Sequence, residues 1–310
     1  MKKDRIKLIL NPNADMGNAW KKAADLRYIA ESYGEVSWAG TVFPTHAKEL
    51  AHQAALEGYD LVIAVGGDGT AHEVVNGLME VPEKKRPKFS IVPLGSGNDY
   101  AANLGLPKKP EEALMAILTG KTKKFDLALI EDETGRQEYW DNTINIGFGG
   151  NVTIFSHNLP ILRGFMMYLV AVIQTILMRY DVLDVKITID DDKVWQNQSM
   201  MICLCNGPRE GGGFITAPGA ELDDGDLNYS FLGKVSRLMM FRMIPEFMNG
   251  TQEKFEKIVH PGKFKKMVIE SKQPLILHTD GEVFAGLSHD VHMLKVEVLP
   301  DAIEVVVPSE

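Results

Sequence analysis

The sequence predicts two domains: an α/β domain with a parallel sheet, followed by a mainly antiparallel β domain. The chain has 310 residues, which exceeds the size at which a single core usually keeps growing. Strand and helix patterns alternate over residues 1–131, as in parallel α/β sheets. Over residues 132–300, short β-like runs alternate with Gly, Pro, Asn and Asp turns. A last apolar run within 301–310 can return to either domain.

The first domain is expected to alternate strands and helices in a regular order. Apolar runs predict strands at 6–10, 36–42, 61–65, 89–92 and 125–130. Helical periodicity predicts helices at 19–32, 47–57, 71–79 and 110–119, with a further helix ending at 103. The loops that follow parallel strands meet at one edge of the sheet, where ligands collect.

The second domain is expected to contain many strands and few helices. The predicted strands are 185–189, 200–205, 227–232, 266–269, 275–278, 294–299 and 303–307. Two helical patterns interrupt them, at 162–179 and 236–249. The turn-forming sequence at 131–135 lies near the predicted domain boundary.

A glycine turn after the third strand is the most informative local feature. Gly66, Gly67, Asp68, Gly69 and Thr70 stand between a buried strand and a helix. Glycines let a phosphate approach the backbone, and the N–H groups at a helix start then face it. The simpler interpretation is a tight turn in which the aspartate and the threonine are helix caps. Because this motif follows a buried strand, the pattern favours nucleotide binding.

Two more loops follow apolar strands directly. Residues 11–17 come after the first strand, and residues 93–99, Pro-Leu-Gly-Ser-Gly-Asn-Asp, come after the fourth. In a parallel sheet these loops and the glycine turn meet at the same edge. Their convergence is stronger evidence for a phosphate site than any single loop.

Composition narrows the classes of partner. The formal net charge of −9 argues against nucleic-acid binding. Cys203 and Cys205 are the only cysteines and are expected to be buried thiols in a reducing cytoplasm. The uncharged stretch 164–178 is shorter than the roughly 20 residues of a spanning helix. The Met-rich segment 236–249 fits either core packing or a lipid surface.

Four motifs in order carry a resemblance to a known family. They are Asn11-Pro12 with Gly17, the turn 66–70 with Glu73 and Asn76-Gly77, the loop 93–99, and Asp280-Gly281-Glu282. This set resembles the diacylglycerol kinase catalytic-domain family, which includes bacterial lipid kinases and sphingosine and ceramide kinases. The resemblance implies a Rossmann-like N-terminal domain, similar to NAD kinases and phosphofructokinases, and a C-terminal β-sandwich.

The resemblance and the loops together predict the site residues. Asp280 is expected to be the general base that activates a lipid hydroxyl, with Glu282 orienting it; the alternative gives Glu282 the base role. Asp68 is expected to help position the phosphates. By the family match, Asp224 offers a carboxylate to a structural Mg²⁺, and Glu221 and Asp226 offer main-chain oxygens; an Asp-rich hairpin turn is the alternative. ATP is expected to contact Asn11, Thr41, Gly66, Gly67, Asp68, Gly69, Thr70, Glu73, Gly95, Ser96, Asn98 and Asp99.

The resulting hypothesis is an ATP- and Mg²⁺-dependent lipid kinase of phospholipid metabolism, acting on diacylglycerol or a related lipid. The alternatives are a kinase for NAD or another small molecule, and a regulator that binds nucleotide or lipid without catalysis. We expect a cytoplasmic protein that touches the membrane surface transiently. A homodimer is a further expectation, and no nucleic-acid partner is expected.

Overall fold

The structure, a computed structural model, describes residues 4–159 and 162–309. Its contacts divide the chain into two compact units. Unit 1 holds residues 1–125 and 301–310, and unit 2 holds residues 126–300. Strands β5 (Lys121–Asp132) and β17 (Met293–Val307) contain the two points at which the chain passes from one unit to the other.

Unit 1 is built on a parallel sheet. The four strands β1 (Arg5–Leu10), β2 (Glu35–Gly40), β3 (Leu61–Gly66) and β4 (Lys88–Pro93) lie in the order β4-β3-β1-β2. All neighbouring pairs among them are parallel, and the end of β17 joins β4 in parallel at Val305 and Phe89. The predicted α/β fold is therefore confirmed.

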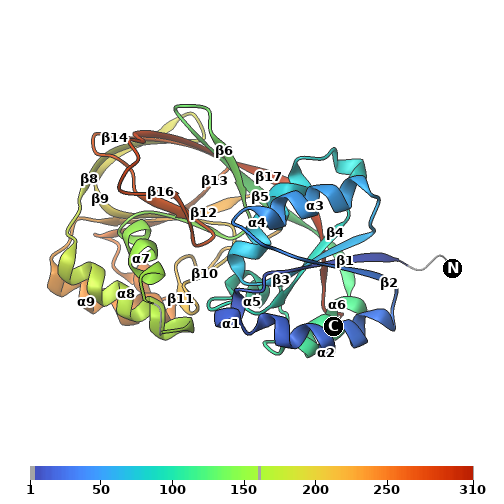
Figure 1. Ribbon diagram of the computed structural model, residues 1–310. Helices are drawn as coiled ribbons and strands as arrows, with labels where there is room; N and C mark the ends of the chain where they lie inside the picture. The colour runs from blue at the N-terminus through green and yellow to red at the C-terminus, as the bar shows by residue number, and fades with distance from the viewer. Residues whose placement is uncertain (1–3, 160–161, 310) are drawn as a thin grey trace. The chain divides into compact units, whose positions relative to one another are not determined.

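Helices cover both faces of this sheet. In Figure 1, α3 (His46–Leu56) and α4 (Asp68–Met79) lie above β1 and β3, whereas α2 (Ala19–Glu31) and α6 (Pro110–Leu118) lie below them. Every residue of the central strand β3 is buried, as expected for a strand covered on both faces. The helices of this unit are α1 (Ala14–Gly17), α2 (Ala19–Glu31), α3 (His46–Leu56), α4 (Asp68–Met79), η1 (Glu83–Lys85), α5 (Asp99–Asn103) and α6 (Pro110–Leu118).

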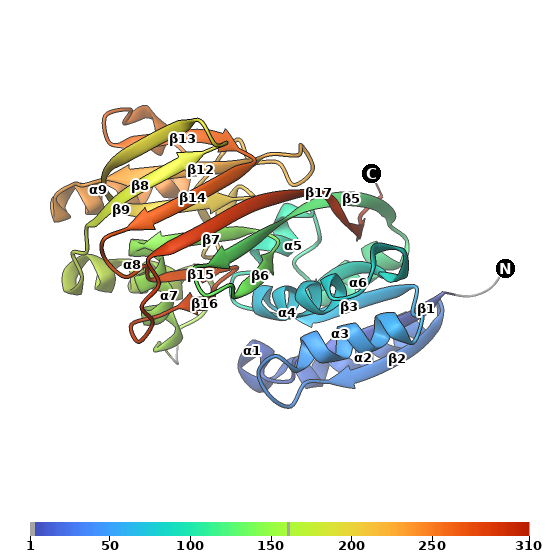
Figure 2. The ribbon, with the colours of Figure 1, turned by 90° about the horizontal axis from the view of Figure 1, so that it is seen from above.

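Unit 2 is an antiparallel β-sandwich, as predicted. Strand β9 (Lys193–Cys205) pairs with β8 (Leu183–Ile189) through its first half and with β7 (Thr143–Gly147) and β12 (Leu227–Gly233) through its second half, so it connects the strands of the sandwich. Figure 2 shows β8, β9, β12, β13 and β14 side by side. The other strands are β6 (Gln137–Trp140), β7 (Thr143–Gly147), β8 (Leu183–Ile189), β10 (Arg209–Glu210), β11 (Phe214–Ile215), β12 (Leu227–Gly233), β13 (Val259–Phe264), β14 (Lys266–Ser271), β15 (Leu277–Thr279) and β16 (Glu282–Ala285).

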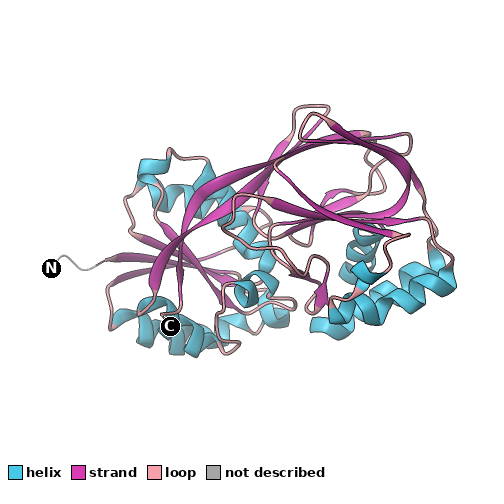
Figure 3. Cartoon of the chain, turned by 180° about the vertical axis from the view of Figure 1, so that it is seen from behind, coloured by secondary structure: helices cyan, strands magenta, loops and turns pink. Residues whose placement is uncertain are grey.

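Three helices gather on one side of the strands of unit 2 (Figure 3). They are α7 (Phe148–His157), α8 (Gly164–Met178) and α9 (Arg237–Asn249), and the short η2 (Gln252–Lys254) follows α9. They share an apolar cluster with the buried thiols Cys203 and Cys205 of β9. Over the described part of the chain, no helix has both the length and the apolar character needed to cross a bilayer.

Several elements differ from the sequence prediction. Helix α7 was not predicted, because Gly149, Gly150 and β-branched residues lower its helical propensity. Strand β13 was not predicted either, since Pro261 and Gly262 are unusual within a strand. Strand β17 continues through the turn-like Pro300 and Asp301, where two separate strands were expected.

Candidate functional site

The two glycine loops of unit 1 touch each other through their backbones. Gly67 ends the loop after β3, and Gly95 lies in the loop after the neighbouring strand β4. A Cβ atom built on Gly95 would lie 2.3 Å from the Cα of Gly67, and one on Gly67 would lie 2.9 Å from the Cα of Gly95. Leu94 N–H also donates to Gly66 O at 2.7 Å. The loops therefore form one compact surface that requires glycine at both positions.

Helix α4 begins at this surface. Gly67 is its N-cap and has no side chain to satisfy the first N–H groups of the helix. The N–H groups at the start of a helix carry the positive end of its dipole, so they favour an anion. Asp68, the first helical residue, accepts a hydrogen bond from Tyr100 N–H at 3.1 Å. Its carboxylate thus links the start of α4 to α5.

Three predicted polar residues hold the loops in shape. Asn11 Nδ2 donates to Thr70 Oγ1 at 3.3 Å, which joins the loop after β1 to α4. Asn98 adopts a left-handed conformation with φ 54°. Its side chain accepts from Gly95 N–H and donates to Gly95 O, both at 2.8 Å. Ser96, which lies between Gly95 and Asn98 in the sequence, is exposed.

The remaining predicted residues of unit 1 have mixed surroundings. The Glu73 carboxylate accepts from Thr45 N–H at 2.8 Å and from Ala47 N–H at 2.9 Å, so it caps the start of α3. Thr41 N–H donates to Leu10 O at 2.9 Å, which places Thr41 next to the loop after β1. Asp99 is buried at the start of α5. Contacts of Thr41, Glu73 and Asp99 with ATP stay predictions.

In unit 2, Asp280 lies in the two-residue turn between β15 and β16. Asp280 and Gly281 have φ values of 49° and 88°, as in a type I′ hairpin turn. The Asp280 side chain is buried, and its carboxylate accepts the N–H groups of Asp141 at 3.0 Å and of Asn142 and Thr143 at 2.9 Å each. These three bonds hold the carboxylate in one orientation. Glu282, two residues on, is exposed.

A buried histidine supports this turn. Nδ1 of His278 accepts from Gly281 N–H at 3.2 Å, which leaves Nε2 as the protonated nitrogen of the neutral ring. Burial lowers the pKa of His278 to about 4, although the nearby Asp280 carboxylate acts in the opposite direction. Nε2 lies 3.7 Å from Glu210 Oε2, and Glu210 Oε1 accepts from Asn145 Nδ2 at 2.8 Å. His278 therefore connects the Asp280 turn with strands β7 and β10.

The predicted metal site at Asp224 contains a different cation. The Lys263 ammonium group pairs with the Asp224 carboxylate, and Lys265 Nζ lies 3.6 Å from Asp226 Oδ1. The hydrogen bond and charge of Asp224 raise the pKa of Lys263. Among the residues that the structure describes, no three His, Cys, Asp or Glu side chains could share a metal ion. The predicted site uses only one carboxylate, together with main-chain oxygens of Glu221 and Asp226, so Glu221, Asp224 and Asp226 stay a prediction, in which the metal ion would take the place of the Lys263 ammonium group.

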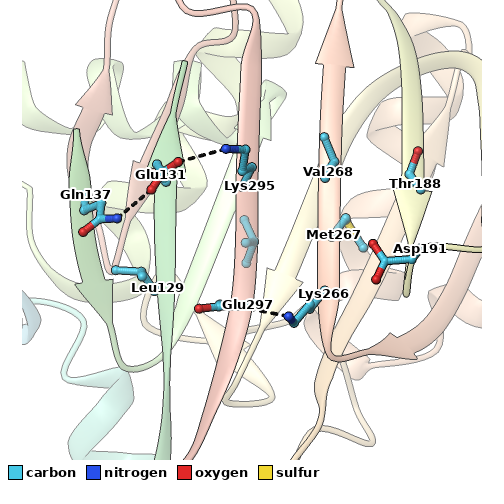
Figure 4. Close-up of a pocket in the computed structure, with 11 residues that line it drawn as sticks. Leu129, Glu131, Gln137, Thr188, Asp191, Lys266, Met267, Val268, Lys295 and Glu297 are labelled. Carbon is cyan, nitrogen blue, oxygen red and sulfur yellow. Dashed lines mark hydrogen bonds and ion pairs between the residues drawn. The ribbon is translucent and has the colours of Figure 1, made fainter. Parts of the chain in front are cut away.

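A hollow on the sheet of unit 2 carries paired charges. It has a volume of about 390 Å³, and Figure 4 shows its lining residues. Glu131 accepts from Gln137 and pairs with Lys295 at 3.0 Å, and Lys266 lies 3.7 Å from Glu297. Because both lysines of this hollow are already paired with glutamates, we assign no ligand to it.

Comparisons with known proteins identify the family. Residues 5–130 match the model of the diacylglycerol kinase catalytic domain, and residues 142–307 match that of the YegS C-terminal NAD kinase beta sandwich-like domain. The chain belongs to the diacylglycerol kinase family. The enzyme is accordingly a phosphotransferase with an alcohol group as acceptor.

Relatives support the assignment over most of the enzyme. The "Probable lipid kinase YegS-like" of Chromohalobacter salexigens is 30% identical, with 88% of this chain and 89% of the relative aligned. The protein of the same description from Yersinia enterocolitica is 28% identical and covers 97% of this chain, with 96% of its own length aligned. A crystal structure of a diacylglycerol kinase from Bacillus anthracis has a TM-score of 0.76 at 22% identity, covering 99% of this chain and 98% of the other. That likeness concerns the fold.

Sequence reasoning missed the partners of the predicted residues. The amides of residues 141–143 that hold Asp280 are 137–139 positions away, and backbone N–H groups carry no sequence signal. Glu210 and Lys263 were also missed, because their partners lie on elements that are distant in sequence. His278 lies on β15 only two residues before Asp280, and this short distance in sequence was an available signal.

Proposed function

We propose that the enzyme transfers the γ-phosphate of ATP to the free hydroxyl of diacylglycerol or a related lipid. The observation that carries the donor half is the backbone contact between Gly67 and Gly95 at the start of α4. Side-chain-free loops beside a helix N-terminus suit a polyphosphate, and Mg²⁺ bound to ATP would neutralise part of its charge. Asn11, Asp68 and Asn98 keep the loops in this arrangement.

The acceptor half of the proposal rests on the Asp280 turn. A lipid hydroxyl is a weak nucleophile at neutral pH, and a carboxylate close to its proton assists its attack on phosphorus. In this proposal, three backbone N–H groups aim the Asp280 carboxylate, and the exposed Glu282 assists. The reverse assignment, with Glu282 as the base, is the alternative that the experiment below distinguishes.

The proposal includes a transient contact with the membrane surface through α8 and α9. Leu238 is 81% exposed, and Leu177, Met178 and Met166 are each more than half exposed. These apolar side chains lie on two helices that pack against each other (Figure 1). Exposed apolar side chains on neighbouring helices can insert into a lipid surface, and a lipid substrate supplies a reason for such a contact. The corresponding location is the cytoplasmic surface of a membrane.

The function is tested with γ-labelled ATP and a panel of acceptors that includes diacylglycerol, ceramide, sphingosine and NAD. We expect label in a lipid product and none in NAD phosphate. Transfer to NAD alone would support the small-molecule kinase instead, and ATP binding without any product would support a regulator. Asp280→Asn should abolish transfer but keep ATP binding, whereas Glu282→Gln should lower the rate less. The opposite ranking would assign the base to Glu282.

Asp190 provides a matched control for Asp280. It also has a positive φ, 49°, and its carboxylate accepts two backbone N–H groups, from Lys265 at 2.8 Å and Lys266 at 2.9 Å. Asp190→Asn therefore makes the same chemical change at another hairpin, where the carboxylate also accepts backbone N–H groups but is exposed. Equal loss of activity in both variants would attribute the effect to folding and refute the assignment.

Membrane contact is tested by sedimentation with lipid vesicles. Leu177→Asp should weaken vesicle binding, whereas Leu56→Asp on α3 should not, although the two leucines are 62% and 60% exposed. Equal vesicle binding by both variants would show that α8 does not contact the membrane. Size-exclusion chromatography of the same variants tests the other explanation for these exposed side chains, which is that they lie in the interface of a homodimer.

A further inference from the structure

A second hollow in unit 2 has an aromatic wall. It has a volume of about 520 Å³ and lies where strands β9, β12 and β13 meet the segment that follows α9. We call it the aromatic pocket. Its aromatic residues are Trp195, Tyr229, Phe231 and His260, and its other lining residues are Ile189, Lys193, Glu253, Glu256, Val259 and Pro261.

The rings of the aromatic pocket pack into a continuous surface. Tyr229 and Phe231 stack with centroids 4.4 Å apart, and Trp195 lies 5.0 Å from Phe231. Trp195 also lies 5.7 Å from His260, at 54° between the rings. Tyr229 and Phe231 are buried, whereas Trp195 and His260 are partly exposed. The faces available to a ligand are therefore those of the tryptophan and the histidine.

Charges of opposite sign lie at the two ends of this wall. Lys193 Nζ donates to the Tyr229 hydroxyl at 3.2 Å and lies 5.9 Å from the centre of its ring. The exposed Glu253 and Glu256 belong to the segment that leads into Val259, beside His260. Tyr229 pairs with Gly262 and Phe231 with His260, so the two ends are separated by at least two strand residues, roughly 7 Å.

We propose that the aromatic pocket binds a zwitterionic ammonium phosphate, the chemistry of a phospholipid head group such as phosphocholine. Lys193 would contact the phosphate. The faces of Trp195 and His260 attract an alkylammonium group, and the two glutamates supply its counter-charge. With one lysine and two glutamates, the pocket favours a ligand that carries both signs over a simple anion.

The aromatic pocket is separate from the proposed phosphotransfer residues. Tyr229 and Phe231 pair with Leu204 and Ile202 of β9, and these four side chains belong to one apolar cluster, which Trp195 joins. Cys203, which accepts from Asn145 of the Glu210 and His278 network, belongs to the other cluster. Successive side chains of a strand point to opposite faces of the sheet, so the pocket and this network lie on opposite faces. The bound head group would therefore not be the acceptor of the phosphoryl group, and the inference goes beyond the proposed function.

The experiment measures binding of soluble phosphocholine to the full chain by isothermal titration calorimetry. Inorganic phosphate and tetramethylammonium serve as the two halves of the ligand. We expect saturable binding of phosphocholine that is tighter than that of either half. Trp195→Leu should weaken phosphocholine binding about two- to fivefold. The double variant with Glu253→Gln and Glu256→Gln should also weaken this binding. Tetramethylammonium binding as tight as that of phosphocholine would overturn the zwitterion assignment.

Two controls separate pocket binding from folding and from non-specific effects. Trp20→Leu removes a tryptophan that is 59% exposed in unit 1 and should leave phosphocholine binding unchanged. The kinase activity of Trp195→Leu in detergent should match that of the original protein. The test of phosphocholine binding and the test of the kinase function can therefore fail independently. Unchanged phosphocholine binding by Trp195→Leu would refute the proposal.

Vesicles distinguish the source of the head group. Phosphatidylcholine vesicles that bind more tightly than phosphatidylglycerol vesicles, with the difference lost in Trp195→Leu, would identify a membrane lipid as the ligand. Tryptophan-dependent binding of phosphocholine without this vesicle preference would identify a free head group. Absence of both effects would refute the proposal.

Discussion

The contact between the two glycine loops allows a quantitative test of the donor site. Gly95→Ala places a Cβ atom 2.3 Å from the Cα of Gly67, whereas carbon atoms in contact lie about 3.5–4.0 Å apart. The loops must therefore separate by more than about 1 Å. Overpacking of this kind costs about 1–3 kcal/mol, and each kcal/mol lowers the Tm by about 2–4 °C in a domain of this size.

The same displacement should weaken nucleotide binding, because the start of α4 moves relative to the loop after β4. A loss of about 1.4 kcal/mol corresponds to tenfold in Kd. Gly67→Ala should behave in the same way but more mildly, since its Cβ would lie 2.9 Å from Gly95 Cα and its φ of −101° suits alanine. Calorimetric titration with ATP and thermal unfolding measure the two effects.

Gly40→Ala is the matched control. It changes a glycine of the same unit whose added Cβ would meet nothing within 4 Å, so the Tm and ATP affinity should stay at their original values. Gly95→Ala with the original Tm and the original ATP affinity would refute the packing argument. Equal losses in all three variants would show that the steric contact is not the cause.

Three further predictions concern electrostatics. Because the pKa of His278 is lowered in the folded protein, a falling pH protonates this imidazole in the unfolded chain before it does so in the folded one. The contribution of the neutral ring to the free energy of unfolding is therefore complete above pH 6.5 and falls by about 3 kcal/mol as the pH drops toward 4. His278→Asn, whose Oδ1 can still accept from Gly281, should reduce this slope in urea unfolding curves. Lys263→Gln should make the Tm rise on addition of Mg²⁺, because the Asp224 carboxylate loses its ammonium partner. Glu73→Ala should cost about 1 kcal/mol of stability through loss of the α3 cap.

Each of these predictions has a contrary outcome. An unchanged pH slope in the asparagine variant would mean that another group titrates in this range. A Tm of the original protein that already falls with EDTA would mean that a metal ion displaces Lys263. If Glu73→Ala lowers the ATP affinity but not the stability, Glu73 contacts the nucleotide, as the sequence predicted.

The α/β fold and the position of the glycine loops could be predicted because their signals are local. The run Leu61–Gly66 is apolar throughout and ends in glycines, so both the strand and the turn follow from adjacent residues. Strand β13 had no such signal, since Pro261 and Gly262 suggest a turn. In the structure, Gly262 is needed because an added Cβ would lie 2.4 Å from the Tyr229 ring.

The candidate site was harder to predict where its contacts are distant in sequence. Asp280-Gly281 forms a tight turn between β15 and β16, as Asp-Gly pairs commonly do. The three amides that bind its carboxylate have no characteristic residue type. The pairing of Lys263 with Asp224 joins β13 to a loop 39 positions earlier, and neither residue alone indicates it. Long-range contacts of this kind depend on strand pairing, which single-sequence patterns do not specify.

Strand β17 has a consequence for how the polypeptide acquires its structure. The last residues of this strand belong to unit 1, where Ser90 Oγ donates to Val306 O at 2.8 Å and Arg86 to Ala302 O at 2.9 Å. During synthesis, unit 1 cannot complete its sheet until the segment 301–307 has left the ribosome, after all of unit 2 has been made. The two glycine loops are thus encoded early, but the sheet that supports them is finished last.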